Sequence, residues 1–413
     1  MADRQHNLFD TEVPQWELDS QAELVVATVV FPSGLAKPLD YTVPDSLRDS
    51  IEPGRRVRVP LGRSNRSVIG YCVAVENQQQ SDRRLKCIDE VIDPQTLLSL
   101  SLLRLTEWMA GYYLCPWGQV LETVIPAGVR VGAGTRLTTL LTIAPDAKQK
   151  LSSLKLPKKQ SAVIDCLIAE QTPLTPAGLA SAVGCTQAPI TALRRKGLIH
   201  SEVQRIGVAI STDEVLAEEP QLKLNADQSV ALKGIMSSLR RQQHDTILIH
   251  GVTGSGKTEV YMHAIQEVVG YGRQAIVLVP EISLTPQTVS RFRARFGQVA
   301  VLHSHLTNVQ RHQEWARISS GSVQVIVGAR SAIFAPTPHL GLIVIDEEHE
   351  SSFKQDTAPR YHAREVAQRR AETEGVPLVL GSATPSLESF QRSQEGQYKL
   401  VTMESRVFER PLP

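Results

Sequence analysis

The distribution of hydrophobic residues divides the chain into three parts with different periodicity. From residue 23 the apolar positions form short β-branched runs broken by proline and glycine, ELVVATVVF, RRVRVPLG and SVIGYCVAVE. Such runs predict a small β-rich barrel or sandwich, and LLSLSLLRLTEWMAGYYL at 97–114 predicts an amphipathic helix that closes it. We therefore expect a β-rich domain over 23–127, preceded by a polar tail at 1–22.

The middle part, residues 128–212, changes to helical periodicity. A linker-like stretch with several glycines at 128–150 includes RLTTLLTIAP, a candidate short strand. Three helical segments follow, PKKQSAVIDCLIAEQ, TPAGLASAVG and TQAPITALRRKG, and then a β-like LIHSEVQRIGVAI. Three helices followed by a strand pair predict a winged helix. The basic residues Arg194, Arg195 and Lys196 fit contact with nucleic acid, whereas a winged helix that contacts protein or is purely structural is an equally good interpretation.

The last part, residues 213–413, begins with an acidic, linker-like stretch and then alternates strands with helices. Its apolar strands are continuous runs of valine, isoleucine and leucine: TILIH, AIVLVP, VQVIVG, LIVIDE and PLVLGSAT. Continuous runs are typical of strands that are buried on both faces of a parallel sheet. The fold that we expect is a multidomain α/β chain ending in a RecA-like, parallel-sheet nucleotide-binding lobe.

The composition is that of an ordinary globular protein. Of 413 residues, 42% are hydrophobic and 21% are charged, and the net charge is +1. Nucleic-acid contacts must therefore use local basic patches. The five cysteines include no C-x-x-C pair, which favours reduced thiols in the cytoplasm over a disulfide framework or metal site. The polar start and the lack of a long apolar run lead us to expect no signal peptide and no membrane partner.

One loop carries the clearest chemical signal. The residues GVTGSGKT match G-x-x-x-x-G-K-[ST] and lie between the run TILIH and the helical TEVYMHAIQEVV. The glycines let backbone N–H groups point at phosphate oxygens, and the helix N-terminus adds its dipole. Lys257 reaches the β- and γ-phosphates, and Thr258 offers a hydroxyl to Mg²⁺. The predicted ATP-binding loop consists of Gly251, Val252, Thr253, Gly254, Ser255, Gly256, Lys257 and Thr258.

A second motif, DEEH, follows the apolar run LIVI. Asp346 at the end of a strand can hold Mg²⁺ opposite Thr258, and Glu347 can orient or deprotonate an attacking water. Two acids beside a triphosphate are unfavourable without a cation, so the pair also implies Mg²⁺. The predicted catalytic residues are Lys257, Asp346 and Glu347. A strand that merely ends in acidic turn residues is the weaker interpretation.

Other polar groups follow strands of the same predicted sheet, where ligands of open α/β sheets bind. The amide of Gln228, upstream of the phosphate loop, can pair with adenine. The loops at 279–287 and 327–334 can hold a sugar-phosphate backbone through N–H groups and Arg330. Ser382 and Thr384 in GSATPS offer hydroxyls that could link the ATP site to a nucleic-acid site.

The order of these motifs resembles the first motor lobe of superfamily 2 helicases. The closer wording, GVTGSGKTEVY, LVPEISLTPQ, GARSAIFAP, VIDEEHESSFKQ, RYHARE and LGSATPSLES, is similar to the family of bacterial replication-restart helicases, primosomal protein N′ or PriA. The resemblance, over 23–413, implies an ATP-dependent 3′ to 5′ DNA helicase that recognises stalled or branched forks and initiates primosome assembly. It implies ATP and Mg²⁺ as cofactors. The implied partners are branched DNA with a 3′ end, single-stranded DNA, single-stranded-DNA-binding protein and primosome proteins, in the bacterial cytoplasm at the nucleoid.

The resemblance also implies a pocket for a 3′ DNA end, which in the family uses an aromatic-Asp-Tyr run, a glycine and a lysine. Here the run is Leu39-Asp40-Tyr41, the glycine is Gly62 and the lysine is Lys86. Asp40 would accept a hydrogen bond from the terminal 3′-hydroxyl, and Tyr41 would stack on the last base. Leu39 stands where the family usually has phenylalanine.

The family's aromatic-rich loop, which couples DNA to the ATPase, corresponds to 351–355 and 360–364. The residues agree with this role, since Phe353 and Tyr361 could stack on bases. The cations expected to neutralise phosphate are Lys354, Arg360 and Arg364. A packed surface loop is the alternative, which the polar context disfavours.

The chain departs from the family in its extent. The family continues with a second motor lobe, a zinc-binding insertion and a C-terminal domain, whereas this chain stops at ESRVFERPLP. We expect a fragment or a truncated product with no zinc site, which binds ATP and DNA but hydrolyses little ATP. The arginine finger of a second lobe is worth roughly 10³–10⁵ in rate. A non-motor fork-binding scaffold is the alternative function, and the intact phosphate loop and DEEH argue against it for the parent protein. An RNA-directed helicase is disfavoured by the resemblance alone.

Overall fold

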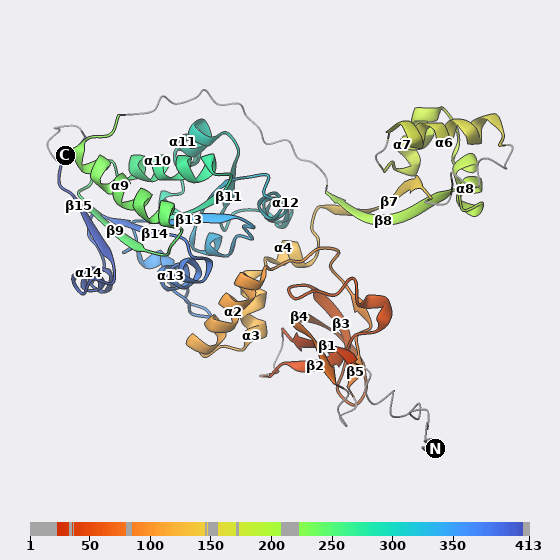
Figure 1. Ribbon diagram of the computed structural model, residues 1–413, viewed down its shortest axis with the longest axis horizontal. Helices are drawn as coiled ribbons and strands as arrows, with labels where there is room; N and C mark the ends of the chain where they lie inside the picture. The colour runs from red at the N-terminus through yellow and green to blue at the C-terminus, as the bar shows by residue number, and fades with distance from the viewer. Residues whose placement is uncertain are drawn as a thin grey trace, which may run out of the picture. The chain divides into compact units, whose positions relative to one another are not determined.

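A computed structural model describes residues 23–32, 35, 37–79, 85–144, 147, 156–170, 173–207 and 223–407 (Figure 1). The predicted polar tail at 1–22 and the acidic stretch at 213–222 lie outside these residues. The chain forms two compact units. The first unit comprises Met1–Val131 and Asp213–Pro413, and the second comprises Gly132–Thr212.

The first unit begins with a six-stranded sheet, as the short β-branched runs predict. Its strands are β1 (Glu23–Val30), β2 (Leu39–Thr42), β3 (Arg56–Leu61), β4 (Arg66–Gln79), β5 (Lys86–Cys87) and β6 (Glu90–Val91), with a 3₁₀ turn at Asp45–Leu47. The order is β5-β2-β1-β4-β3-β6. Because β5 and β6 are neighbours in the chain but pair with opposite edges, the sheet curls until its edges meet at 86–91.

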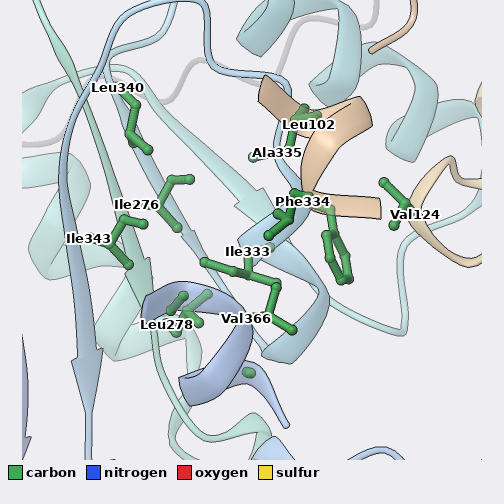
Figure 2. Close-up of a cluster of buried hydrophobic side chains, with 14 of the residues drawn as sticks. Leu102, Val124, Ile276, Leu278, Ile333, Phe334, Ala335, Leu340, Ile343 and Val366 are labelled. Atoms are coloured by element: carbon green, nitrogen blue, oxygen red, sulfur yellow. The ribbon is translucent and has the colours of Figure 1, made fainter. Parts of the chain in front are cut away.

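Short helices join this sheet to the parallel sheet that follows. They are α2 (Leu100–Tyr112), α3 (Trp117–Val124) and α4 (Ala127–Arg130). The hydroxyl of Ser99 accepts a hydrogen bond from the Leu102 N–H at 3.3 Å and so caps α2. In Figure 2, Leu102 and Val124 lie beside Phe334 and Ala335 of the second half of the chain, and all belong to one buried cluster. The β-rich part and the parallel-sheet lobe therefore share a hydrophobic core.

The parallel sheet that the continuous apolar runs predict is present, with seven strands in the order β11-β12-β10-β13-β14-β9-β15. The strands are β9 (Thr246–Gly251), β10 (Gln274–Leu278), β11 (Val299–Leu302), β12 (Val325–Gly328), β13 (Leu340–Asp346), β14 (Leu378–Ser382) and β15 (Lys399–Met403). The runs VAVL and KLVTM, which form β11 and β15, were not predicted. VAVL is apolar and buried but only four residues long, whereas KLVTM mixes polar with apolar residues and is mostly exposed.

Helices cover both faces of this sheet. They are α9 (Ala226–Arg241), α10 (Lys257–Gly270), α11 (Pro286–Phe296), α12 (Asn308–Ser319), α13 (Ala363–Glu374) and α14 (Leu387–Gln394), with 3₁₀ turns at Glu281–Ser283, Arg330–Phe334 and Ser351–Phe353. Buried residues of α9, α10 and α11 share one core, and those of α12 and α13 share the core of the opposite face. The carboxyl ends of the strands thus open at one edge, where the loops carry the chemical motifs.

In its described residues, the second unit contains three helices and one pair of strands. The helices are α6 (Lys158–Glu170), α7 (Pro176–Val183) and α8 (Gln187–Arg195), and the strands are β7 (Thr135–Ile143) and β8 (Ile199–Gly207). The helices agree with the prediction, but among the described residues the strand that follows them has no partner after the helices. β8 pairs antiparallel with β7, which precedes the helices, because their registers match over nine residues each. Within the described residues, no helix is long and apolar enough to cross a membrane.

Candidate nucleotide and DNA sites

The phosphate loop joins β9 to α10 at the carboxyl edge of the parallel sheet. Gly254 and Gly256 take left-handed conformations, with φ of 81° and 80°, which side chains rarely adopt. At Gly256, moreover, a Cβ would lie 2.3 Å from Nε2 of Gln228. These glycines turn the backbone so that the loop wraps the start of α10, and the helix N-terminus then faces the concave side of the loop.

Lys257 is buried within this loop. Its Nζ donates a hydrogen bond to the Gly251 carbonyl at 2.9 Å and lies 3.9 Å from Oε1 of Glu347. The lysine of the phosphate loop and the second acid of DEEH are therefore brought together, although the two motifs are far apart in the chain. A buried ammonium held beside the loop is placed to attract the terminal phosphates of a nucleotide.

Asp346 ends β13, directly beside Gly381 at the end of β14. Burial raises the pKa of Asp346 to about 6, and the adjacent Glu347 adds to the rise while Lys257 opposes it. Tyr261 of α10 is fully buried, and its hydroxyl packs against Gly381. A carboxylate in this surrounding lacks enough positive charge, which is the condition that a bound cation relieves.

The loop also contains an unsatisfied buried hydroxyl. Ser255 is fully buried, and its Oγ has no hydrogen-bond partner among the described residues. An orphaned hydroxyl in a phosphate loop, together with the charge-deficient Asp346, fits a site that takes Mg²⁺ and a nucleotide. Thr258, the predicted Mg²⁺ ligand, begins α10 beside Lys257 and is partly exposed.

Gln228, the predicted adenine-binding residue, lies against the phosphate loop. Its Oε1 accepts from the Asn225 N–H at 2.8 Å, its own N–H donates to the Asn225 side chain at 2.8 Å, and its Nε2 donates to the Ser255 carbonyl at 3.1 Å. The residue is thus half of the capping box that starts α9 and also supports the loop. The structure places it at the nucleotide site but shows no contact that tests pairing with adenine.

The segment after β15 lies across the phosphate loop, which the sequence did not indicate. The Val407 N–H donates to the Gly254 carbonyl at 3.1 Å, and the Val252 N–H donates to the Met403 carbonyl at 3.2 Å. The Ser405 N–H donates to Asp227 at 3.1 Å. The outer side of the loop is therefore held by backbone hydrogen bonds.

Ser382 and Thr384 join the acids of DEEH through a histidine that sequence reasoning missed as a site residue. Nδ1 of His349 lies 2.8 Å from the Ser382 hydroxyl and 3.7 Å from Glu347. The Ser382 hydroxyl in turn accepts from the Thr384 N–H at 3.0 Å. Glu347 adopts a left-handed backbone with φ of 48°, which costs about 1 kcal/mol for such a residue and directs its carboxylate toward these groups. His349 is the fourth residue of the DEEH motif, so the motif itself could have identified it.

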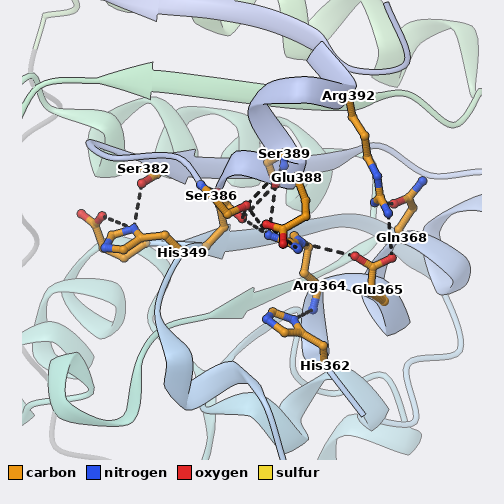
Figure 3. Close-up of polar contacts among 12 residues, drawn as sticks. His349, His362, Arg364, Glu365, Gln368, Ser382, Ser386, Glu388, Ser389 and Arg392 are labelled. Atoms are coloured by element: carbon orange, nitrogen blue, oxygen red, sulfur yellow. Dashed lines mark hydrogen bonds and ion pairs between the residues drawn. The ribbon is translucent and has the colours of Figure 1, made fainter. Parts of the chain in front are cut away.

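The third acid of DEEH, Glu348, is fully buried. Figure 3 shows the polar cluster that contains its partners Arg364, Ser386 and Ser389. It accepts from Nη1 of Arg364 at 2.7 Å, from the Ser386 N–H at 2.7 Å and from the Ser389 hydroxyl at 2.9 Å. Burial alone would raise the pKa of Glu348, but these donors hold it below its usual value. Arg364 is buried with it, so the prediction that Arg364 neutralises DNA phosphate is wrong in this structure: its charge is already paired inside the protein.

The aromatic rings of the coupling loop are also internal. Phe353 and Tyr361 are each only 1% exposed, and Tyr361 packs edge-on against Phe334 at 5.1 Å. A ring must expose a face to stack on a base, so the predicted stacking by these two residues is wrong here. Arg330 is partly exposed, and it donates to the Ser352 carbonyl at 3.2 Å and to the Lys354 carbonyl. The cations of the loop that remain exposed are Lys354 and Arg360.

Of the residues expected at the 3′ end, Lys86 and Gly62 meet at the turn between β3 and β4. Nζ of Lys86 donates to the Gly62 carbonyl at 2.5 Å and to the Asn65 side chain at 2.7 Å. Tyr41 is 3% exposed and donates to the Pro60 carbonyl at 3.2 Å, so its ring cannot stack on a base and that prediction is wrong here. Asp40, on the opposite face of β2, is exposed and accepts from the Thr28 hydroxyl at 2.9 Å.

The second unit keeps its basic residues at the surface. Arg194, Arg195 and Lys196, at the end of α8, are all exposed. Arg194 and Lys196 each donate one hydrogen bond, to Ser201 and Gln160 respectively, both at 3.0 Å. A shallow hollow beside them is lined by Thr191, Ile199 and His200.

Comparison with known proteins agrees with this geometry. The profile of the 3′ DNA-binding domain (3′BD) of PriA matches residues 28–126, and that of the DEAD/DEAH box helicase matches 225–393. The replication restart protein PriA of Bacillus subtilis is 36% identical to this chain, and the match covers 95% of this chain and 56% of the length of that protein. The corresponding values are 36%, 90% and 51% for Haemophilus influenzae PriA and 43%, 82% and 39% for Synechocystis PriA.

The chain spans about half the length of the curated relatives that it matches. The two matched regions correspond to two parts of the fold: residues 28–126 to the curled sheet with α2 and α3, and residues 225–393 to the parallel-sheet lobe with its phosphate loop. The chain therefore belongs to the family of replication restart proteins PriA, of which it carries the 3′ DNA-binding domain and the DEAD/DEAH box helicase domain.

Proposed function

We propose that the chain is the DNA-end-binding and nucleotide-binding part of an ATP-dependent helicase that moves 3′ to 5′ on branched DNA in replication restart. The observation that carries this proposal is the convergence of Lys257, Asp346 and Glu347 at the carboxyl edge of the parallel sheet. No local segment of the chain provides all three groups, so the fold itself assembles the charges that a nucleoside triphosphate requires.

The roles of these residues follow from their positions. The backbone of 251–258 binds the phosphates, and Lys257 orients the terminal one. Thr258 and Asp346 would hold Mg²⁺, which supplies positive charge against the developing negative charge of the transferred phosphoryl group. Glu347, held by His349, is placed to orient the attacking water. The link from Glu347 through His349 to Ser382 and Thr384 connects this chemistry to the start of α14.

The DNA contacts that we propose use exposed groups. Asp40 would accept from a terminal 3′-hydroxyl near the turn that Lys86 and Gly62 form, and Lys354 and Arg360 would neutralise phosphate. The second unit would act as a winged helix whose α8 presents Arg194, Arg195 and Lys196 to DNA. We further propose domain limits at 23–127, 128–212 and 213–413. The proposed partners are single-stranded-DNA-binding protein and primosome proteins at the bacterial nucleoid.

The test is equilibrium binding of a fluorescent, non-hydrolysable ATP analogue in the presence of Mg²⁺. Lys257→Ala should weaken binding by more than tenfold, since a buried charge-assisted contact to phosphate is worth about 1.5–3 kcal/mol. Lys233→Ala, at an exposed position of α9, is the matched control and should bind as the wild type does. Equal binding by Lys257→Ala and the wild type would remove the basis of the proposal.

A further inference from the structure

The carboxyl end of α2 carries a group of large apolar side chains that are not buried. We call this group, Trp108, Tyr112, Tyr113 and Leu114, the aromatic platform. Tyr112 is 58% exposed and Leu114 is 92% exposed. Leu114 also takes a left-handed backbone, with φ of 50°, in the turn that follows the helix. Large side chains held outward in a strained turn are unusual unless they contact something.

The rings of the aromatic platform form an ordered stack. Trp108 and Tyr112 lie parallel with ring centres 4.9 Å apart and an angle of 22° between planes. Tyr113 packs edge-on against Tyr112 at 4.9 Å. Trp108 and Tyr113 cover part of the Tyr112 ring, but 58% of Tyr112 remains exposed, so the exposed part of the ring can receive a flat, unsaturated group.

Cations surround the aromatic platform. Nζ of Lys354 lies 5.6 Å from the ring centre of Tyr113, and the guanidinium of Arg369 lies 5.9 Å from that of Trp108. The Tyr113 hydroxyl accepts from the His362 N–H at 3.2 Å. This hydrogen bond and the Lys354 contact fix the platform against the loop 354–360, which also exposes Arg360.

We propose that the aromatic platform stacks an unpaired base of a single DNA strand, while Lys354 and Arg360 contact its phosphates. An exposed ring stack beside cations is the combination that binds single strands without regard to sequence. The nearby acids are few: Asp356 and Glu107 are exposed, whereas Glu365 is paired with Arg364 and Arg392. The platform also lies within the 28–126 match to a 3′ DNA-binding domain, which favours DNA over a protein partner.

The inference rests on the proposed function, in that it takes the chain to bind DNA, and it adds a contact distinct from the 3′ end. The coupling loop itself cannot stack bases, since Phe353 and Tyr361 are buried. The aromatic platform supplies exposed rings beside the same loop. A base stacked on Tyr112 would therefore contact the coupling loop. That loop ends at Arg364, which donates a hydrogen bond to Glu348 of DEEH.

The test is the affinity of the chain for a labelled oligodeoxythymidylate, measured by fluorescence anisotropy with a 3′-hydroxyl and with a 3′-phosphate. Tyr112→Ala should raise Kd about tenfold for both strands, the loss expected for one aromatic-base stack. Tyr112→Phe should bind as the wild type does. Tyr271→Ala is the matched control, because Tyr271 is a tyrosine with 62% exposure at the end of another helix.

Salt dependence separates stacking from charge. Tyr112→Ala should leave the slope of log Kd against log salt unchanged, whereas Lys354→Ala should reduce it by roughly 0.7, the value for one phosphate contact on a single strand. Unchanged DNA affinity of Tyr112→Ala is the result expected of a surface that docks protein, and it would overturn this inference but not the proposed function. An equal loss of affinity in Tyr271→Ala would do the same. Failure of the wild type to bind either strand would overturn the proposed function and this inference together.

Discussion

Three consecutive acids at the end of β13, Asp346, Glu347 and Glu348, have three different environments, although their chemistry is nearly the same. Asp346 is buried without enough positive charge, and burial raises its pKa to about 6. Glu347 is partly exposed and reaches Lys257. Glu348 is fully buried but well supplied with donors, and its pKa is lowered. The partners, and not the residue type, therefore separate the first two, which lie near Lys257 of the phosphate loop, from the third, which belongs to a buried polar cluster.

Replacement of Glu348 by glutamine should destabilise the parallel-sheet lobe. The change removes the charge opposite the buried Arg364 while it keeps the shape, so we expect a loss of about 3 kcal/mol in the free energy of unfolding. Chemical denaturation followed by circular dichroism measures it. Glu388→Gln is the control, because Glu388 lies 3.9 Å from Arg364 but is 69% exposed. Similar effects of the two changes would contradict a buried role for Glu348.

His362 predicts a pH effect of known sign. It caps α13 by accepting from the Arg364 N–H at 3.2 Å, and burial lowers its pKa to about 4, helped by the charge of Arg364. The ordinary pKa of histidine is about 6.5, so between pH 6.5 and 4 the unfolded chain binds more protons than the folded one. The contribution of neutral His362 to the free energy of unfolding should therefore fall as the pH falls through this window. The loss is complete only below about pH 4.

The variant His362→Asn keeps a side-chain acceptor at the cap but cannot titrate. The difference in free energy of unfolding between this variant and the wild type should be roughly 1 kcal/mol more favourable to the variant at pH 5 than at pH 7.5. This value allows for the partial exposure of His362. Thermal melts at the two pH values measure the difference. The exposed His339→Asn should show no such change, and a His362→Asn difference that is independent of pH would refute the assignment.

Motif residues could be predicted from the sequence because their spacing and order carry the chemistry. Lys257 and Glu347 meet as expected. The failures at this scale concern burial: Tyr41, Phe353, Tyr361 and Arg364 have the right chemistry for DNA contact but are internal. An aromatic or basic residue in a polar stretch gives no local signal of which neighbour will cover it, since that depends on segments elsewhere in the chain.

At the scale of elements, α4 and α12 illustrate how close packing links the β-rich part to the parallel-sheet lobe. A Cβ on Gly128 of α4 would lie 2.2 Å from the carbonyl oxygen of Asn308, which starts α12. Only glycine permits this approach. The sequence read the region around Gly128 as a linker, because glycines that serve a turn and glycines that serve packing look alike in a sequence.

Gly128→Ala should therefore push α4 away from α12 and lower the free energy of unfolding by about 1–3 kcal/mol. Differential scanning calorimetry measures the change. Gly111→Ala in α2 is the matched control: its Cβ would meet nothing within 4 Å, and alanine in a helix should be neutral or stabilise by up to about 1 kcal/mol. If both variants melt like the wild type, the two helices are not tightly packed.

Other elements were predicted with different success for identifiable reasons. The five central strands of the parallel sheet were found because strands buried on both faces are apolar throughout. The edge strand β11 was missed because its apolar run is only four residues long, and β15 was missed because most of its residues are exposed and its run mixes polar with apolar residues. In the second unit the helices were found from their periodicity. The partner of β8 was assigned wrongly, because strand pairing is long-range and leaves no mark on local sequence.

For the molecule as a whole, the central claim is that DNA-end binding and nucleotide binding belong to one continuous body. The supporting observation is the shared core in which Leu102 and Val124 of the β-rich part pack with Phe334 and Ala335 of the parallel-sheet lobe. The sequence predicted both functions but treated them as separate domains. The spacing of apolar residues in the sequence predicts which face of a helix is buried. It does not predict which surface that face packs against.

The most direct test of this claim is the affinity for a strand with a free 3′-hydroxyl, measured with and without a non-hydrolysable ATP analogue and Mg²⁺. Coupled sites typically shift each other's affinity by about 5–150-fold. We predict that the analogue changes the Kd of the wild type for this strand at least about fivefold, and that Lys257→Ala abolishes the change without altering the Kd measured in the absence of nucleotide. An identical Kd of the wild type under both conditions would contradict the account.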